Sequence, residues 1–255
     1  MYTLNKHVRW REDNGKILIC DCKRLTDLKI PLGFKKEIIE IESGVKENDI
    51  KGKLRSLFLD FKQLKLLSKL EIREIKDNEF KNAMKILDEE IKERVRDNDF
   101  LFKKYKEFSK FFIGVFLDDD IIGVICGFPR EDYLLMSEIA IDPRFRRRGF
   151  GNKLVREFEK IGKKGGFKRI NVGARDSAIE FYKSLNYDFF LLIQFKKEFY
   201  SIENFKNLDI RGSKMSGDYI IIEVNMDKLN LKVLENLRKE YPNASFQYIF
   251  TKMII

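Results

Sequence analysis

The densest group of residues that could bind a charged ligand lies between Pro143 and Arg169. Eleven lysines and arginines oppose only two glutamates there, so the segment carries +9 of the chain's net charge of +10. Arg146, Arg147 and Arg148 stand near its start and lead into Gly149-Phe150-Gly151. Because the cations are concentrated rather than spread over a wide face, they favour a compact anion such as a pyrophosphate. A nucleic-acid patch remains an open alternative.

Two predicted elements position this segment. Residues 133–141 read as a strand that stops at Asp142-Pro143, and residues 149–162 have apolar side chains at helical spacing. A helix opened by glycines leaves unpaired N–H groups and the positive end of its dipole at its N-terminus, which together form an anion site. The sequence has no P-loop pattern, and it lacks the third glycine and the downstream acid of a Rossmann unit.

The order strand, Asp-Pro, Arg-x-x-Gly-x-Gly, amphipathic helix resembles motif A of the GNAT acetyltransferases, with Arg146, Gly149 and Gly151 at the three motif positions. The resemblance implies that the loop amides hold the pyrophosphate of coenzyme A and that the strand backbone contacts its pantetheine arm. The cofactor-binding residues expected on this basis are Ile139, Ala140, Ile141, Arg146, Arg147, Arg148, Gly149, Phe150, Gly151, Asn152, Arg175 and Ser177. Arg175 is either a phosphate contact or a surface residue.

Residues 174–187, with the sequence ARDSAIEFYKSLNY, resemble motif B of the same family. Ser177 and Glu180 form the pattern of a capping box, which predicts the start of a helix there. Asn186 stands where the family has glycine, and asparagine tolerates the left-handed conformation that this position needs. The resemblance makes Tyr182 the general acid that protonates the leaving thiolate, although its spacing with Ile179 and Leu185 also fits a core aromatic.

The resemblance implies direct acyl transfer from acetyl-CoA to an amine. A lysine-like amine has a pKa of about 10.4, so a base must remove a proton before the amine attacks. Glu138, on the strand before the loop, is the candidate base, with Glu180 and Asp176 as alternatives. Glu138 could equally be an exposed strand residue or the ion-pair partner of a neighbouring arginine. His7 is the only histidine in the sequence, so catalysis by a Ser-His-Asp triad or a Cys-His pair and most histidine metal sites are excluded. No metal is expected.

The predicted fold class is α+β with α/β character: a GNAT acyl-CoA N-acyltransferase fold whose mixed central sheet is flanked by helices, with small α+β modules at both ends. Residues 1–69 form the N-terminal module, 70–200 the acetyltransferase domain and 201–255 a C-terminal β-α-β module. The first module is read as a generic α+β cap, with a PqqD-like winged-helix peptide-recognition module as the weaker alternative. The last extends the sheet, stands alone or makes a homodimer contact.

Periodicity predicts further elements within this frame. Helices are expected over residues 54–70 and 79–96, the second with Phe80, Met84, Leu87, Ile91 and Val95 on one face. A hairpin is expected over residues 111–128, with its turn at Asp118-Asp119-Asp120.

Composition and the pattern of apolar residues restrict the compartment in which the protein is expected to work. No apolar run is long enough for a membrane helix, and Met1 to Trp10 lacks a signal sequence. Three cysteines do not make a disulfide framework, which fits a reducing cytoplasm. Charged residues make up 36% of the chain, a balance typical of hyperthermophile proteins.

Two functions are consistent with these patterns. The first is an N-acetyltransferase acting on a protein N-terminus, a lysine or a small amine, so its partner is a small molecule or a peptide. The second is a non-catalytic acetyl-CoA sensor whose N-terminal module binds nucleic acid or peptide.

Overall fold

The computed structural model describes residues 1–92, 94 and 96–255. They form two compact units: Met1–Cys126 with Glu138–Ile161, and Gly127–Ser137 with Gly162–Ile255. Strands β7 (Asp120–Pro129) and β8 (Leu134–Ile141) and helix α5 (Phe150–Lys164) each contribute residues to both units. The three-module division at residues 69 and 200 stays a prediction.

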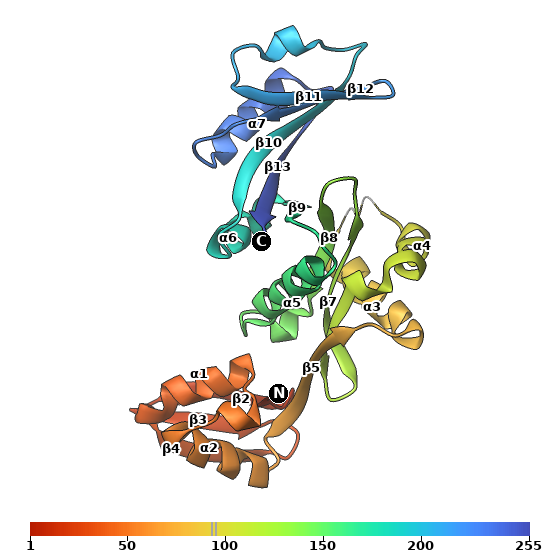
Figure 1. Cartoon of the computed structure of the whole chain (residues 1–255). Helices are drawn as coiled ribbons and strands as arrows, with labels where there is room; N and C mark the ends of the chain where they lie inside the picture. The colour runs from red at the N-terminus through yellow and green to blue at the C-terminus, as the bar shows by residue number, and fades with distance from the viewer. Residues whose placement is uncertain (93, 95) are drawn as a thin grey trace. The chain divides into compact units, whose positions relative to one another are not determined.

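The first unit begins with a small sheet under two helices (Figure 1, red to orange). Strands β2 (Val8–Asp13), β3 (Lys16–Asp21) and β4 (Thr26–Pro31) pair antiparallel in that order. Helices α1 (Lys35–Ser43) and α2 (Gly52–Gln63) pack against them. Ile17 and Ile19 from the sheet, Ile38 from α1 and Phe61 from α2 are nearly inaccessible to solvent and share one core cluster. Buried and less buried residues therefore alternate along β3, and the buried ones face both helices.

Strand β5 (Leu67–Glu74) belongs to two pairings. Its first residues pair with β1 (Tyr2–Leu4), and its last five pair with β6 (Phe112–Leu117). The helix predicted over residues 54–70 is therefore wrong beyond Gln63. Lys65 adopts a left-handed conformation that ends the helix, and the apolar residues after it, Leu67 and Leu70, have become strand positions.

The strand order in the first unit continues as β1-β5-β6-β7-β8. Helices α3 (Phe80–Glu90) and α4 (Asn98–Phe108) bury Met84, Leu87 and Leu101 in a cluster with Phe112 and Phe116 of the sheet. The predicted helix over residues 79–96 was too long, because α3 ends where Ile91 leaves the helical conformation. Val95 lies outside the described residues. Helix α4 was not predicted.

The second unit holds β9 (Arg169–Gly173), β10 (Asp188–Lys196), β11 (Ile210–Ser216), β12 (Tyr219–Val224) and β13 (Ala244–Met253). With the start of β8, the order is β8-β9-β13-β10-β12-β11 (Figure 1, cyan to blue). β8 and β9 are parallel and the other pairs are antiparallel, so the sheet is mixed. Because β13 lies between β9 and β10, the C-terminal segment extends the sheet. Helices α6 (Ile179–Ser184) and α7 (Leu231–Glu240) complete the unit.

Short 3₁₀ helices fill several connections: η1 (Leu32–Phe34), η2 (Glu47–Asp49), η3 (Asp77–Glu79), η4 (Ser109–Phe111), η5 (Pro143–Phe145), η6 (Asp176–Ala178) and η7 (Ile202–Phe205). Among the described helices, none is both long and apolar enough to span a membrane.

Two leucines of α2 test whether the N-terminal core contributes to stability. Leu57 is 5% exposed and Leu59 is 51% exposed on the same helix. Leu57→Ala should lower the free energy of unfolding by about 2–5 kcal/mol, because it leaves a cavity in the core. Leu59→Ala should change it by less than about 0.5 kcal/mol. Urea denaturation of both variants measures the difference, and equal effects would contradict the packing described for α2.

Candidate functional site

The loop between β8 and α5 has a backbone suited to an anion. Asp142 begins η5 by accepting a hydrogen bond from the amide of Arg144 at 2.9 Å. Arg147 and Gly149 then adopt left-handed conformations, with φ of 62° and 77°. The amide of Lys153 donates to the carbonyl of Gly149 at 3.1 Å, so the three amides between them precede the first intrahelical hydrogen bond. Those amides and the helix dipole have the arrangement expected of an anion site, and the site itself stays a prediction.

The three consecutive arginines before Gly149 differ in their surroundings. Arg146 donates from Nε to the carbonyl of Ile141 at 3.0 Å and forms an ion pair with Glu90. The Arg148 side chain is only 8% exposed, and its Nε lies 3.3 Å from Glu42 Oε1. Arg147 is exposed, and its guanidinium has no partner within the described part of the chain. The charge counted from the sequence is therefore partly neutralised, and Arg147 is the arginine of the loop most available to a ligand.

Glu42 ties the N-terminal module to this loop. Besides Arg148, its carboxylate accepts a hydrogen bond from Trp10 Nε1 at 3.2 Å, and its backbone carbonyl accepts one from Thr3 Oγ1 at 2.7 Å. Burial lowers the pKa of Arg148, against the opposing effect of Glu42. One guanidinium nitrogen of Arg148, Nη1, is buried with no hydrogen-bond partner. Arg148 thus acts as a link between loop and module.

Glu138 lies on β8 with its side chain 7% exposed. Its Oε2 accepts a hydrogen bond from Arg94 Nε at 2.9 Å. Burial raises the pKa of Glu138, and the same carboxyl is also affected by Arg94 and Arg96, which lower its pKa, and by Asp88, which raises it. A carboxyl with a raised pKa inside a domain suits a general base. The ion pair that the sequence left as an alternative is present, and the role of Glu138 as a base stays a prediction.

Tyr182 lies in the second unit, on α6, and is 3% exposed. Its hydroxyl donates to the sulfur of Met136 at 3.9 Å, and its ring packs 5.5 Å from that of Phe250. Burial raises the pKa of Tyr182, so the phenol stays protonated at neutral pH. The side chain is therefore part of an aromatic core and also in the protonated state that a general acid needs.

The helix that carries Tyr182 starts differently from the prediction. Ser177 lies within η6, and neither η6 nor α6 has a side-chain cap, so the predicted capping box is wrong. The 3₁₀ turn moves the helix start beyond Ser177, and the neighbouring Asp176 pairs with Arg238 at 3.0 Å instead. Arg175 and Ser177 are both exposed. Asn186 has a φ of 59°, which confirms the left-handed conformation expected at the end of this helix.

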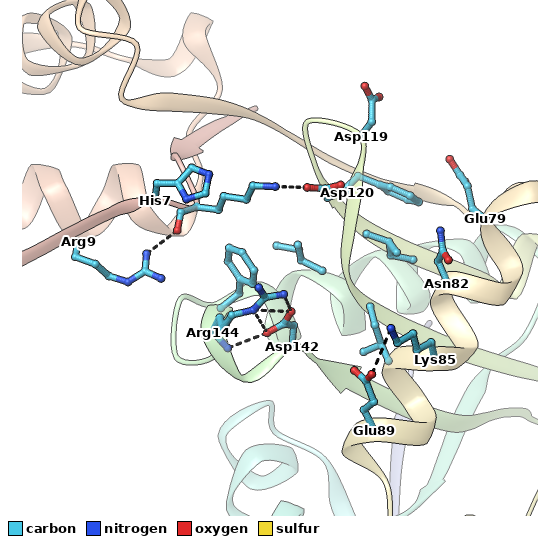
Figure 2. A pocket seen from close by; sticks show the side chains of 16 residues that line it. His7, Arg9, Glu79, Asn82, Lys85, Glu89, Asp119, Asp120, Asp142 and Arg144 are labelled. Carbon is cyan, nitrogen blue, oxygen red and sulfur yellow. Dashed lines mark hydrogen bonds and ion pairs between the residues drawn. The ribbon is translucent and has the colours of Figure 1, made fainter. Parts of the chain in front are cut away.

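A cavity of about 600 Å³ opens beside the loop in the first unit (Figure 2). Its walls come from the turn before β2, from α3, from the β6–β7 hairpin and from the residues after β8. Figure 2 shows the ion pair between Arg144 and Asp142 at one side of it. Lys6 pairs with Asp120, and Lys85 lies 3.7 Å from Glu89. Because its charges are largely matched in pairs, the cavity has no net preference for an anion.

Several partners of these residues were missed in the sequence. Arg94 follows α3 and is 44 positions away from Glu138, so no local pattern joins them. The cap of α4 was detectable: Asp97 accepts a hydrogen bond from the amide of Phe100 at 2.7 Å, and aspartate is a preferred N-cap residue. Within residues 1–92, 94 and 96–255, no group of three or more His, Cys, Asp or Glu side chains could hold a metal ion.

Comparison with known proteins assigns the central part of the chain. The family model described as "Acetyltransferase (GNAT) family" matches residues 71–187. No curated protein sequence matches the chain.

Solved structures of similar fold include Ard1 from Thermoplasma volcanium (18% identity, 62% of this chain and 99% of that one, TM-score 0.45). The ribosomal-protein-S18-alanine N-acetyltransferase from Escherichia coli has 15% identity over 64% of this chain and 98% of its own, with a TM-score of 0.43. Naa50 from Arabidopsis thaliana, in complex with a bisubstrate analogue, has 15% identity over 62% and 98%, with a TM-score of 0.42. At this level of similarity the family match carries the assignment.

Removing Glu42 tests the link between module and loop. Glu42→Gln should lower the free energy of unfolding by about 3 kcal/mol, because it leaves the buried guanidinium of Arg148 without a countercharge. Adding Arg148→Met should recover much of the loss, since neither charge is then buried alone. Thermal and urea unfolding of the single and double variants provide the comparison. A double variant that loses the sum of both single losses would argue against a direct pair.

Proposed function

Since residues 71–187 form an acetyltransferase domain of the GNAT family, we propose that the protein transfers the acetyl group of acetyl-CoA directly to an amine. Acetyl-CoA supplies the activated acyl thioester. The acceptor is a protein N-terminus, a lysine or a small amine. Three free cysteines support a reducing compartment such as the cytoplasm as the place of action.

The observation that carries the proposal is the loop that enters α5. Left-handed Gly149 aims the amides of Phe150, Gly151 and Asn152 outward at a helix N-terminus, where a pyrophosphate would accept from them. Arg147 would add a full positive charge. Phe150 is buried and contributes only its backbone. The backbone of Ile139, Ala140 and Ile141, on the strand before the loop, would hold the pantetheine arm.

Glu138 is proposed to accept the proton of the attacking amine. Its raised pKa makes it a stronger base than a surface carboxylate, while Arg94 favours its ionised form. Glu180 is a weaker candidate because its side chain is 81% exposed and paired with Lys183.

Tyr182 is proposed to donate a proton to the departing thiolate. A tyrosine phenol is protonated at neutral pH, and burial raises the pKa of Tyr182 further. The weak contact with a methionine sulfur leaves its proton uncommitted to a strong acceptor.

The sensor function remains the second candidate, favoured by one observation. The Glu42–Arg148 pair connects the N-terminal module to the proposed phosphate loop, so binding at one could affect the other. Turnover separates the two functions, because a sensor would bind acetyl-CoA without consuming it in the presence of amines.

Acetyl-CoA at one hundred times its dissociation constant should add about 2.7 kcal/mol to the stability of the protein. The expected rise in unfolding temperature is on the order of 5–10 °C for a chain of this size. Gly149→Glu should abolish the rise, because the new side chain places a carboxylate at the anion site. Gly166→Glu is the matched control: this glycine also has a positive φ and open space around it, but lies at the other end of α5. Loss of the rise in both variants would contradict a specific site at Gly149.

Activity should depend on pH through Glu138. The base works only when ionised, so the rate should fall as the pH drops through its pKa, which burial places above the usual 4.5. Glu138→Gln should lower kcat by about 10²- to 10⁴-fold and remove this acid limb. Glu180→Gln should keep both the rate and the limb. Steady-state rates against pH for the three proteins give the answer, and an unchanged limb in Glu138→Gln would exclude Glu138 as the base.

A further inference from the structure

We propose that Cys20 and Cys22 form a redox-active dithiol, which a low-molecular-weight disulfide such as oxidised glutathione converts reversibly into an internal disulfide. Cys20 lies near the end of strand β3, and Cys22 is the first residue of the turn that leads to β4. The pair has no part in the proposed acetyl transfer.

The two thiols differ in their surroundings from the third cysteine of the chain. Cys126 is completely buried in the cluster between α3, α4 and the sheet. Cys20 is half-buried and Cys22 is exposed, and both are free. Cysteine is among the residue types most often buried, and an accessible thiol is open to oxidation. Packing therefore accounts for Cys126 but not for Cys20 and Cys22.

The two sulfur atoms already lie close together. The thiol of Cys22 donates to the sulfur of Cys20 at 3.9 Å. A disulfide bond is about 2.05 Å long, so the two sulfurs must approach each other further for the bond to form. Cys22 stands beyond the last residue of β3, where no strand pairing restricts its side chain. Rotation of the two side chains can therefore bring the sulfurs into bonding distance.

The residue between the cysteines fixes the turn that carries Cys22. Asp21 is 6% exposed, and its Oδ1 accepts hydrogen bonds from the amides of Lys23 at 3.0 Å and Arg24 at 3.3 Å. The amide of Cys22 donates to the carbonyl of His7 at 3.0 Å. These bonds hold the backbone so that the thiols are neighbours before any reaction. Such positioning lowers the entropy cost of joining them.

Asp27 makes the two thiols unequal. It lies opposite Cys20 in the pairing of β3 with β4. A hydrogen bond with the Asp27 side chain is the main cause that raises the pKa of Cys20 to about 11, and the contact with Cys22 and burial add to it. Cys20 is therefore protonated at neutral pH, and the exposed Cys22 is the sulfur that an incoming disulfide meets first. The charged residues that face Cys20 from its neighbouring strands are Arg9 and Arg11 of β2 and Asp27 and Lys29 of β4.

The exchange takes place in two steps. Cys22, as a thiolate, attacks one sulfur of the external disulfide; a bond to Cys22 Sγ forms, the external S–S bond breaks, and one thiol leaves after taking up a proton. Cys20 then loses its proton to water and attacks Cys22 Sγ. The internal disulfide forms as the second external thiol leaves and is protonated. Two protein thiols are oxidised, and one external disulfide is reduced to two thiols.

The test treats the full-length protein with excess oxidised glutathione at neutral pH and follows its intact mass. The wild-type protein should lose two hydrogen atoms and retain no glutathione, and its thiols, titrated after denaturation, should fall from three to one. Cys126 is the internal control, because its burial should preserve its thiol. Dithiothreitol should restore all three thiols. A persistent glutathione adduct, a disulfide-linked dimer or an unreacted protein would overturn the inference.

Single serine variants separate the roles of the two cysteines. Cys20→Ser should retain one glutathione on Cys22, because no second thiol is left to displace it. Cys22→Ser should react far more slowly, since the thiol that remains is protonated. Unfolding temperatures equal to that of the wild-type protein confirm that both variants are folded. Uptake of glutathione by Cys22→Ser at the wild-type rate would contradict the order of attack.

Asp27→Asn tests whether Asp27 positions the proton of Cys20. Without the carboxylate, the pKa of Cys20 should fall from about 11 towards its ordinary value of 9.0. The mixed disulfide should then close up to about tenfold faster at neutral pH, because the larger thiolate fraction outweighs its lower nucleophilicity. Lys29→Gln, on the same strand and face, is the matched control and should close at the wild-type rate. The wild-type closing rate should itself rise with pH, and a flat profile or an Asp27→Asn variant that closes no faster would exclude this role for Asp27.

Discussion

A buried guanidinium needs a carboxylate beside it to offset the loss of hydration. Two such ion pairs fix strand β8 and the loop that enters α5 in this protein. Arg94 and Arg148 are each only 8% exposed, and each meets a glutamate, Glu138 and Glu42. Burying an ion costs several kcal/mol, which the opposite charge and further hydrogen bonds must offset. The positions of both arginines are consequently restricted far more than those of surface cations.

The two pairs act on different segments. The Glu42–Arg148 pair joins α1 of the N-terminal module to the loop that enters α5, and Trp10 and Thr3 add hydrogen bonds to the same glutamate. The Glu138–Arg94 pair joins strand β8 to the connection between α3 and α4. In each case one guanidinium nitrogen is left over. Both ends of the segment that leads from the proposed base to the proposed phosphate loop are therefore anchored by charge.

Much of this arrangement could be predicted from local patterns. The loop and its glycines follow from residue types that allow a left-handed backbone, and Asn186 follows in the same way. Regular elements with clear periodicity, such as β8 and α5, were predicted within a few residues. The helix predicted from Leu54 to Leu70 was too long. Its apolar spacing continues past the left-handed residue Lys65, because apolar spacing alone does not mark where a helix ends. The partners of Glu138 and Arg148 are long-range contacts that only the folded chain brings together.

The insertion of β13 between β9 and β10 has a consequence for how the chain is made. β9 and β10 are close in sequence, yet they do not pair with each other: β9 pairs with β8 and β13, and β10 pairs with β13 and β12. During synthesis, the edge of β9 and the edge of β10 that will pair with β13 therefore stay open until β13 has been made. Loop closure of this length slows folding. The second unit must be completed after translation of β13, whereas the pairing of β5, β6 and β1 in the first unit can already form while synthesis continues.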